Sequence, residues 1–195
     1  GDSLPARCRS PLTLIPAHIC EVVAGIFFFS PHLGYSSSMI ERATFAAGCF
    51  WGVEDIYRNV PGVIDVVSGY TGGEMENPTY QDVGTDKTGH AEAVEVTYDP
   101  EKIGFEKLVQ IFWDNHNPTT VNRQGPDIGT QYRSAIFYHT PEQKVIAKKS
   151  KADLEASKKW KTPIVTEIVE AKPFYRAEEY HQRYLEKHGL SNCHV

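Results

Sequence analysis

The chain has 195 residues, 41% of them hydrophobic and 23% charged, with a formal net charge of -5 at pH 7. This is the composition of a globular protein, and the length allows one sizeable hydrophobic core. The negative balance excludes a general basic surface for nucleic acid, and the lysines between residues 148 and 159 are spaced as on a solvated helix face. The cysteines lie too far apart for a disulfide framework or a zinc finger: Cys8, Cys20, Cys49 and Cys193.

The first 38 residues differ in character from the rest of the chain. Their apolar stretch "VVAGIFFF" follows Glu21 and ends before Pro31, so it is too short to span a bilayer. The basic residues stand too far from this stretch for an ordinary signal peptide. We therefore expect residues 1–38 to be an extension, tag-derived or otherwise unrelated to function, with a targeting segment as the alternative. Residues 39–195 are predicted to form a single domain with a mobile C-terminal tail.

Hydrophobic periodicity predicts alternating strands and helices from Met39 onward. Alternating and β-branched residues predict strands over 40–46, 63–70, 90–99, 133–140 and 163–171. Helical spacing predicts helices over 50–59, 104–116, 141–160 and 176–189. This order indicates an α+β fold, a two-layer sandwich of helices on a mixed β-sheet with a ferredoxin-like core. Residues 71–89 and 117–132 are rich in Gly, Pro, Asn and Asp, and loops this long in a compact domain indicate a functional site.

Cys49 is the first candidate for chemistry, because it follows a predicted strand at a tight turn in "AAGCFWGVEDIY". The N–H groups and the positive dipole end of a helix N-terminus lower the pKa of a thiol placed there and enrich the thiolate. The alternative is a buried structural cysteine, the commoner state of a lone cysteine. The turn at Gly48 favours the reactive interpretation. Phe50 and Trp51 point in different directions at a helix start, so at least one ring is expected to line the approach to the thiol rather than the core.

Glu92 is the second candidate, because strand alternation places it on the same face as Val94 and Val96. A carboxyl group on an apolar face has a raised pKa and can donate a proton near neutral pH. An exposed glutamate paired with a lysine fits the pattern equally well. The His90-x-Glu92 spacing also occurs in zinc deaminases, but the cysteine pair that those enzymes require does not follow.

The long loops and the tail supply the remaining candidates. Tyr80, Asp127 and Tyr132 lie in the loops and could hold a polar oxygen near a thiol and a carboxyl group, or could be packing residues. Cys193 lies beyond the last predicted helix, where a mobile thiol could exchange with Cys49 or serve no function. No metal site is predicted, because Cys193 and its neighbour His194 lack companion ligands.

Six separated blocks of the sequence resemble the A-type peptide-methionine sulfoxide reductases. In chain order these are "GCFWGVE", "GYTGG", "NPTY", "TGHAEAV", "QGPDIGTQYRSAI" and "AEEYHQRYL". The resemblance covers the chain from about residue 43 to residue 193, and separate blocks in one order are poorly explained by chance. The first 38 residues match nothing in this pattern. Only one tail cysteine is present, whereas some members have two, so any recycling relay must be short.

The resemblance implies reduction of methionine S-sulfoxide, free or in proteins, without a metal or an organic cofactor. It implies that Cys49 is the nucleophile, that Phe50 and Trp51 bind the substrate methyl group, and that Glu92 donates the proton. Tyr80, Tyr132 and Asp127 would then arrange the oxygen and nearby water. Cys193 would condense with the Cys49 sulfenic acid to a disulfide, and a thioredoxin-type dithiol would reduce that disulfide. We expect a cytoplasmic monomer that binds neither nucleic acid nor a membrane.

Two other classes of protein are compatible with single features of the sequence. A cysteine–histidine acyl-transfer enzyme would need a histidine base, and His116 or His139 are the candidates. A non-catalytic peptide-binding module would use Phe50 and Trp51 as a docking surface and would tolerate Cys49→Ser. Turnover of a methionine sulfoxide substrate with dithiothreitol separates these classes from a reductase.

Overall fold

The structure, a computed structural model, describes residues 40–190. Its centre is a six-stranded mixed sheet with strand order β7-β6-β1-β3-β2-β8, in which only β6 and β7 pair in parallel. The strands are β1 (Glu41–Ala47), β2 (Val63–Thr71), β3 (Ala91–Tyr98), β6 (Ser134–Tyr138), β7 (Glu167–Glu170) and β8 (Tyr175–Arg176). Within the described residues no helix is long and apolar enough to cross a membrane.

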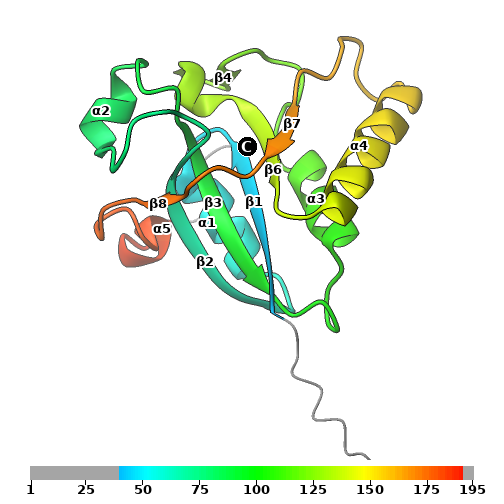
Figure 1. Cartoon of the computed structure of the whole chain (residues 1–195), viewed down its shortest axis with the longest axis horizontal. Helices are drawn as coiled ribbons and strands as arrows, with labels where there is room; N and C mark the ends of the chain where they lie inside the picture. Colours follow the sequence, from blue (N-terminus) through cyan, green and yellow to red (C-terminus); the bar gives the residue numbers. More distant parts are fainter. Residues whose placement is uncertain (1–39, 191–195) are drawn as a thin grey trace, which may run out of the picture. The chain divides into compact units, whose positions relative to one another are not determined.

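Helices cover one face of this sheet (Figure 1). The long ones are α1 (Phe50–Arg58), α3 (Phe105–Asp114) and α4 (Pro141–Ala156). The ring of Phe45 on β1 stacks on Tyr57 of α1 and on Phe105 and Phe112 of α3, with centroid distances of 5.0, 6.0 and 5.5 Å. This aromatic cluster fixes α1 and α3 against the sheet, and α4 packs beside α3. Helix α1 therefore starts from a rigid support.

The opposite face of the sheet is covered as well. Ala91 and Ala93 of β3 belong to a second small core, over which the chain segment between β7 and β8 runs with Ala171 and Phe174 (Figure 1). Both sides of β3 are consequently buried along most of its length, although its sequence alternates between polar and apolar residues. Glu92 lies on the face that α1 covers, with Val94 and Val96, and bonds there to the N–H of Phe50.

Short elements interrupt both of the segments that were predicted as loops. The loop over 71–89 contains the helix α2 (Tyr80–Gly84). The loop over 117–132 contains a small hairpin of β4 (Arg123–Gln124) and β5 (Asp127–Ile128), followed by the 3-10 turn η1 (Thr130–Tyr132). These elements lie beyond the end of β1, where α1 begins (Figure 1).

The predicted α+β fold of helices on a mixed sheet is confirmed, but the predicted helix over 176–189 is wrong. Only α5 (Tyr184–Lys187) is helical there, and it is preceded by turns. Arg183 has a left-handed backbone with φ +54°, which ends any continuous helix at that residue. The side chain of Gln182 instead bonds to both the N–H and the C=O of Ser68 on β2. Long-range hydrogen bonds thus replace the local helical ones.

The turn between β1 and α1 depends on Gly48, so we expect Gly48→Ala to destabilise the protein. Gly48 has φ +94°, and a Cβ there would lie 2.6 Å from Cβ of Gln124. The strain should lower the free energy of unfolding by about 1–3 kcal/mol in urea denaturation. Gly84→Ala is the matched control, because a Cβ at Gly84 meets nothing within 4 Å. Equal stability of the two variants would contradict this account of the turn.

Candidate active site

Cys49 occupies the N-cap position of α1, directly after the Gly48 turn. It is half-buried, and its side chain makes no capping hydrogen bond to the helix. The thiol therefore stands at the positive end of the helix without being used as a cap. The sequence-based placement of Cys49 at a helix start agrees with the structure.

Glu92 lies at the same end of α1. Its side chain is 2% exposed, and its Oε2 accepts a hydrogen bond of 3.2 Å from the backbone N–H of Phe50, the first residue of α1. The pKa of the Glu92 carboxyl is raised to about 8, mainly by burial and in part by the nearby charge of Asp127, against the opposite effect of the Phe50 N–H. The carboxyl group is consequently protonated at neutral pH. Of the two interpretations of Glu92 from the sequence, the buried acid is the correct one.

The two long loops bring Tyr80, Tyr132 and Asp127 to this centre. Tyr80 begins α2, Asp127 lies on β5 and Tyr132 ends η1. Burial raises the pKa of Tyr80 and of Tyr132, and the negative charges of Glu92, Asp127 and a Cys49 thiolate raise both further. Because such coupling fades with distance, these groups share one site. Both phenols remain protonated and can donate hydrogen bonds.

Phe50 and Trp51 take different positions, as their adjacency predicts. Phe50 is 1% exposed and belongs to the core, whereas Trp51 is half-buried. The Nε1–H of Trp51 donates to Nδ1 of His181 at 3.0 Å, and its ring stacks on Tyr184 with a centroid distance of 3.7 Å. Trp51 is therefore held at the edge of the site by the turn before α5.

His181, Tyr184 and Glu178 are residues of this site that sequence reasoning missed. The His181 ring lies 4.5 Å from that of Tyr80 and 5.1 Å from that of Phe50. Glu178 accepts hydrogen bonds of 2.9 Å from the Tyr80 backbone N–H and from the Tyr70 hydroxyl. The block "AEEYHQRYL" contains all three residues, but its helical pattern did not indicate that they contact α1 and α2.

The histidines that an acyl-transfer enzyme would need have other partners. Both ring nitrogens of His116 are used, Nδ1 with the Phe112 carbonyl at 2.6 Å and Nε2 with the Ser134 hydroxyl at 2.7 Å. Burial lowers the pKa of His116 to about 4. His139 bonds to Thr44 of β1 at 2.9 Å. The geometry thus offers Cys49 an acid in Glu92 and supports neither His116 nor His139 as its base.

Cys193, predicted as the partner of Cys49, lies outside the described residues, as do Cys8 and Cys20. In the part of the chain that the structure describes, no group of three or more His, Cys, Asp or Glu side chains could hold a metal ion. A thiol at a helix start beside a buried proton-bearing acid and two phenols is suited to attack a substrate that needs protonation as it reacts. The arrangement is therefore suited to a thiol-dependent reaction at a group that bears a polar oxygen.

Comparison with known proteins identifies the family to which the chain belongs. The sequence profile described as peptide methionine sulfoxide reductase matches residues 41–195. The peptide methionine sulfoxide reductase MsrA of Acidobacterium capsulatum is 58% identical over 154 residues, 79% of this chain and 99% of that protein. The peptide methionine sulfoxide reductase A2-1 of Oryza sativa is 57% identical over 152 residues, 78% of this chain and 80% of that protein.

Solved structures of methionine sulfoxide reductases also match this chain. Mxr1 from Saccharomyces cerevisiae in reduced form matches with a TM-score of 0.76 and 37% identity, covering 83% of this chain and 94% of that one. Methionine sulfoxide reductase A of Corynebacterium diphtheriae matches with a TM-score of 0.70 and 38% identity, covering 79% and 77%. The chain belongs to the peptide methionine sulfoxide reductase family. It is an oxidoreductase that reduces methionine sulfoxide to methionine.

The raised pKa of Glu92 predicts how Glu92→Gln changes stability with pH. Between about pH 4.5 and 8 the folded protein keeps a proton that the unfolded chain releases. Wild-type stability should therefore fall relative to Glu92→Gln as pH rises through this window, by up to about 1.4 kcal/mol per pH unit, and the difference should level off outside it. Urea unfolding at a series of pH values measures the difference. The exposed variant Glu142→Gln should track the wild type, and a pH-independent gap for Glu92→Gln would contradict the assigned burial effect.

Proposed function

We propose that Cys49 attacks the sulfur of methionine sulfoxide while Glu92 delivers a proton to the oxygen. The observation that carries this proposal is the hydrogen bond from the Phe50 N–H to Glu92, which joins the acid to the helix end that bears the thiol. A sulfoxide becomes a good electrophile only when its oxygen is protonated or strongly hydrogen-bonded. A thiol and a neutral acid at one helix terminus meet that requirement, with no cofactor needed.

The chemistry balances with the groups at this site. The Cys49 thiol and the sulfoxide yield methionine and a sulfenic acid on Cys49, so the oxygen atom passes from substrate to enzyme. Tyr80 and Tyr132 remain neutral and can donate hydrogen bonds to the oxygen as charge develops on it. Asp127 keeps the environment negative, which favours the proton remaining on Glu92 until it is transferred.

We assign substrate recognition to the aromatic wall made by Phe50 and Trp51, in which Phe50 is buried and Trp51 presents the more accessible ring. A sulfoxide sulfur carries an oxygen, a methyl group and the rest of the side chain, so fixing the first two while Cys49 fixes the direction of attack determines the handedness that fits. Apolar contact with the rings selects the methyl group, and the Glu92 and tyrosine hydroxyls select the oxygen. This arrangement supports action on a single epimer, the S-sulfoxide, in free methionine and in proteins.

Cys193 is proposed to recycle the enzyme by condensing with the Cys49 sulfenic acid, forming a disulfide and water. The support comes from where the described chain ends. Tyr184 of α5 stacks on Trp51, and α5 closes with a bond from the Leu190 N–H to the Leu185 carbonyl. Three further residues reach Cys193, a span of at most about 11 Å.

A thioredoxin-type dithiol is the proposed reductant of that disulfide. Mxr1 from Saccharomyces cerevisiae has been solved in complex with Trx2, and that chain matches this one with a TM-score of 0.56 and 28% identity, covering 85% of this chain and 94% of that one. We also propose that residues 39–195 form the catalytic domain, since the family profile begins at residue 41, and that the protein works as a monomer in the cytoplasm.

The recycling role is tested with two cysteine variants. Cys49→Ser should abolish reduction entirely. Cys193→Ser should still form about one methionine per enzyme in a single turnover, because the sulfenic acid forms without the second thiol. Its steady-state rate with thioredoxin should collapse, since no intramolecular disulfide can form. Full thioredoxin-dependent turnover by Cys193→Ser would shift the recycling role to Cys8 or Cys20.

The proton-donor role is tested with Glu92→Gln, which keeps the shape of the side chain but cannot deliver a proton. Positioned acid catalysis contributes about 10²- to 10⁴-fold, so the single-turnover rate should fall by that order. Substrate affinity should change little, because the methyl group is bound by Phe50 and Trp51. The loss should be partly relieved at low pH, where solvent can protonate the oxygen. A rate within about threefold of wild type would point to Tyr80 or Tyr132 as the donor instead.

A further inference from the structure

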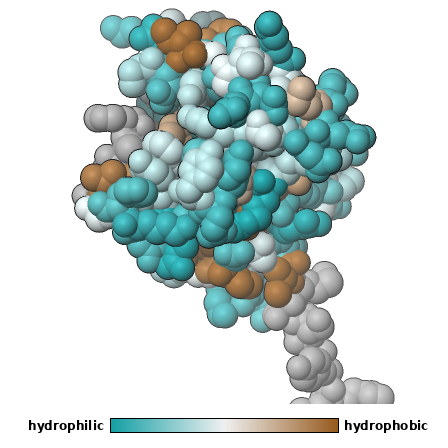
Figure 2. Space-filling view, turned by 90° about the vertical axis from the view of Figure 1, so that its left-hand side faces the viewer, coloured by the Kyte–Doolittle hydropathy of each residue, from teal (hydrophilic) through white to brown (hydrophobic). Residues whose placement is uncertain are grey.

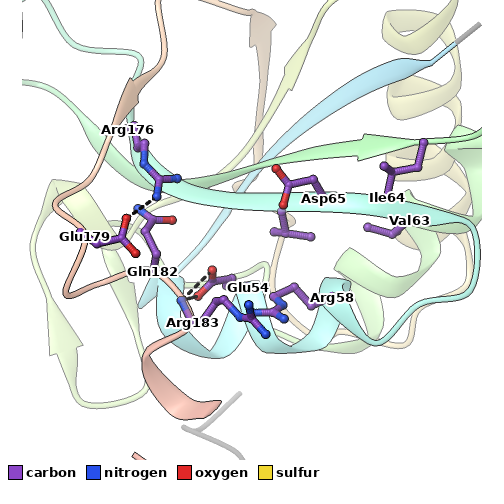
Figure 3. A pocket seen from close by; sticks show the side chains of 10 residues that line it. Glu54, Arg58, Val63, Ile64, Asp65, Arg176, Glu179, Gln182 and Arg183 are labelled. Carbon is purple, nitrogen blue, oxygen red and sulfur yellow. Dashed lines mark hydrogen bonds and ion pairs between the residues drawn. The ribbon is translucent and has the colours of Figure 1, made fainter. Parts of the chain in front are cut away.

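A polar cavity of about 360 Å³ lies along one side of α1, away from Cys49. Figure 3 shows its lining side chains, which come from α1, from β2 and from the segment between β8 and α5. Glu54 and Arg58 of α1 face Gln182 and Arg183 across it. The cavity therefore lies at the interface between α1 and the turn that carries His181 and Tyr184. We call this interface the seam.

Glu54 makes the central contact of this seam. Its side chain is 1% exposed, and both carboxyl oxygens accept the backbone N–H of Arg183, at 2.9 and 2.8 Å. Burial raises the pKa of Glu54, and the Arg183 N–H acts against that rise. Arg183 is also the residue with the left-handed backbone, a conformation that a non-glycine residue keeps only when its surroundings hold it.

The contacts of the seam follow one face of α1 in order. Trp51 and Glu54 are three residues apart, so they are neighbours on the helix surface, and Arg58 continues the same face. Trp51 bonds and stacks with the turn through His181 and Tyr184. One helical turn further, Glu54 holds the Arg183 N–H, and then Arg58 pairs with Glu186 at 3.0 Å.

These contacts differ in how much solvent weakens them. The side chains of Arg58 and Glu186 are 26% and 52% exposed, so their ion pair contributes little. The Glu54 carboxyl is itself buried, although its bond to the exposed Arg183 is only partly buried, and without it the Arg183 N–H would lose its carboxyl partner at a strained residue. Of these two contacts the Glu54 bond is therefore the stronger, and it acts beside the bonds that hold Gln182 of the same turn to Ser68.

We propose that Glu54 is a positioning residue of the substrate site. By holding the Arg183 amide, it keeps the 181–184 turn against Trp51 and so preserves the ring wall that receives the substrate methyl group. This inference rests on the proposed role of Trp51 in substrate binding. It assigns Glu54 to substrate affinity and leaves the chemical step to the groups around Cys49.

The experiment measures single-turnover reduction of a methionine sulfoxide peptide at varied peptide concentration. Glu54→Ala should raise the half-saturating concentration about tenfold while the maximal rate changes less than about threefold. Glu54→Gln, which keeps one acceptor oxygen for the Arg183 N–H, should raise it only about threefold. Glu186→Gln is the matched control, since it removes an exposed carboxylate from the same seam, and it should stay within about twofold. Urea unfolding verifies that each variant is folded at the assay temperature.

A double-mutant cycle with Trp51→Phe separates positioning from a general loss of structure. If Glu54 acts through Trp51, adding Glu54→Ala to Trp51→Phe should raise the half-saturating concentration by less than about threefold more. Additive effects, or a lower maximal rate with unchanged half-saturation, would overturn the proposal. If Trp51→Phe alone leaves the half-saturating peptide concentration unchanged, the assignment of Trp51 to substrate binding is wrong. The proposed role of Glu54 is then wrong as well. Should Glu54→Ala not fold, the same cycle with Glu54→Gln decides.

Discussion

The hydrogen bond between the Phe50 N–H and the Glu92 carboxyl is the interaction on which the site depends. It joins the central strand β3 to the first residue of α1 and places an acid beside the thiol at the helix end. The carboxyl group is tolerated there because it is protonated, and it is protonated because its burial between β3 and α1 raises its pKa. The packing of α1 on β3 therefore both buries the Glu92 carboxyl group and keeps it protonated beside the thiol.

The rest of the molecule holds that pair in place from two sides. The stacked rings around Phe45 fix α1 on the sheet, so the helix end cannot move away from Glu92. On the open side, the turn before α5 brings His181 and Tyr184 against Trp51, and Glu178 ties the start of α2 to the same segment. The reductase site is thus assembled from a rigid helix end and from a turn that has little secondary structure of its own.

The sequence predicted those parts of the site that depend on residue types within a few neighbouring positions. The Gly48-Cys49 turn, the two adjacent rings and the Gly- and Pro-rich loops around Tyr80 and Tyr132 all follow from residue types over a few positions. The resemblance of six short blocks to the methionine sulfoxide reductases added the roles, and the family comparison confirmed the reaction. The hypothesis of a cysteine–histidine enzyme failed because the nitrogens of His116 bond elsewhere, which no pattern in the sequence records.

The sequence by itself determined the α+β order, the helix start at Cys49 and the family of the chain. Only the tertiary structure decided that Glu92 is buried, because alternation assigns it to the face of Val94 and Val96 and does not say that α1 covers this face as far as residue 92. It also decided the turn at Arg183, where the pattern favoured a helix. Helix propensities of ordinary residues differ by only about 0.7 kcal/mol at most, whereas each long-range hydrogen bond contributes about 0.5–1.5 kcal/mol. The bonds of Gln182 to β2 and of Glu54 to Arg183 prevail, because they join residues more than a hundred positions apart that meet only in the folded chain.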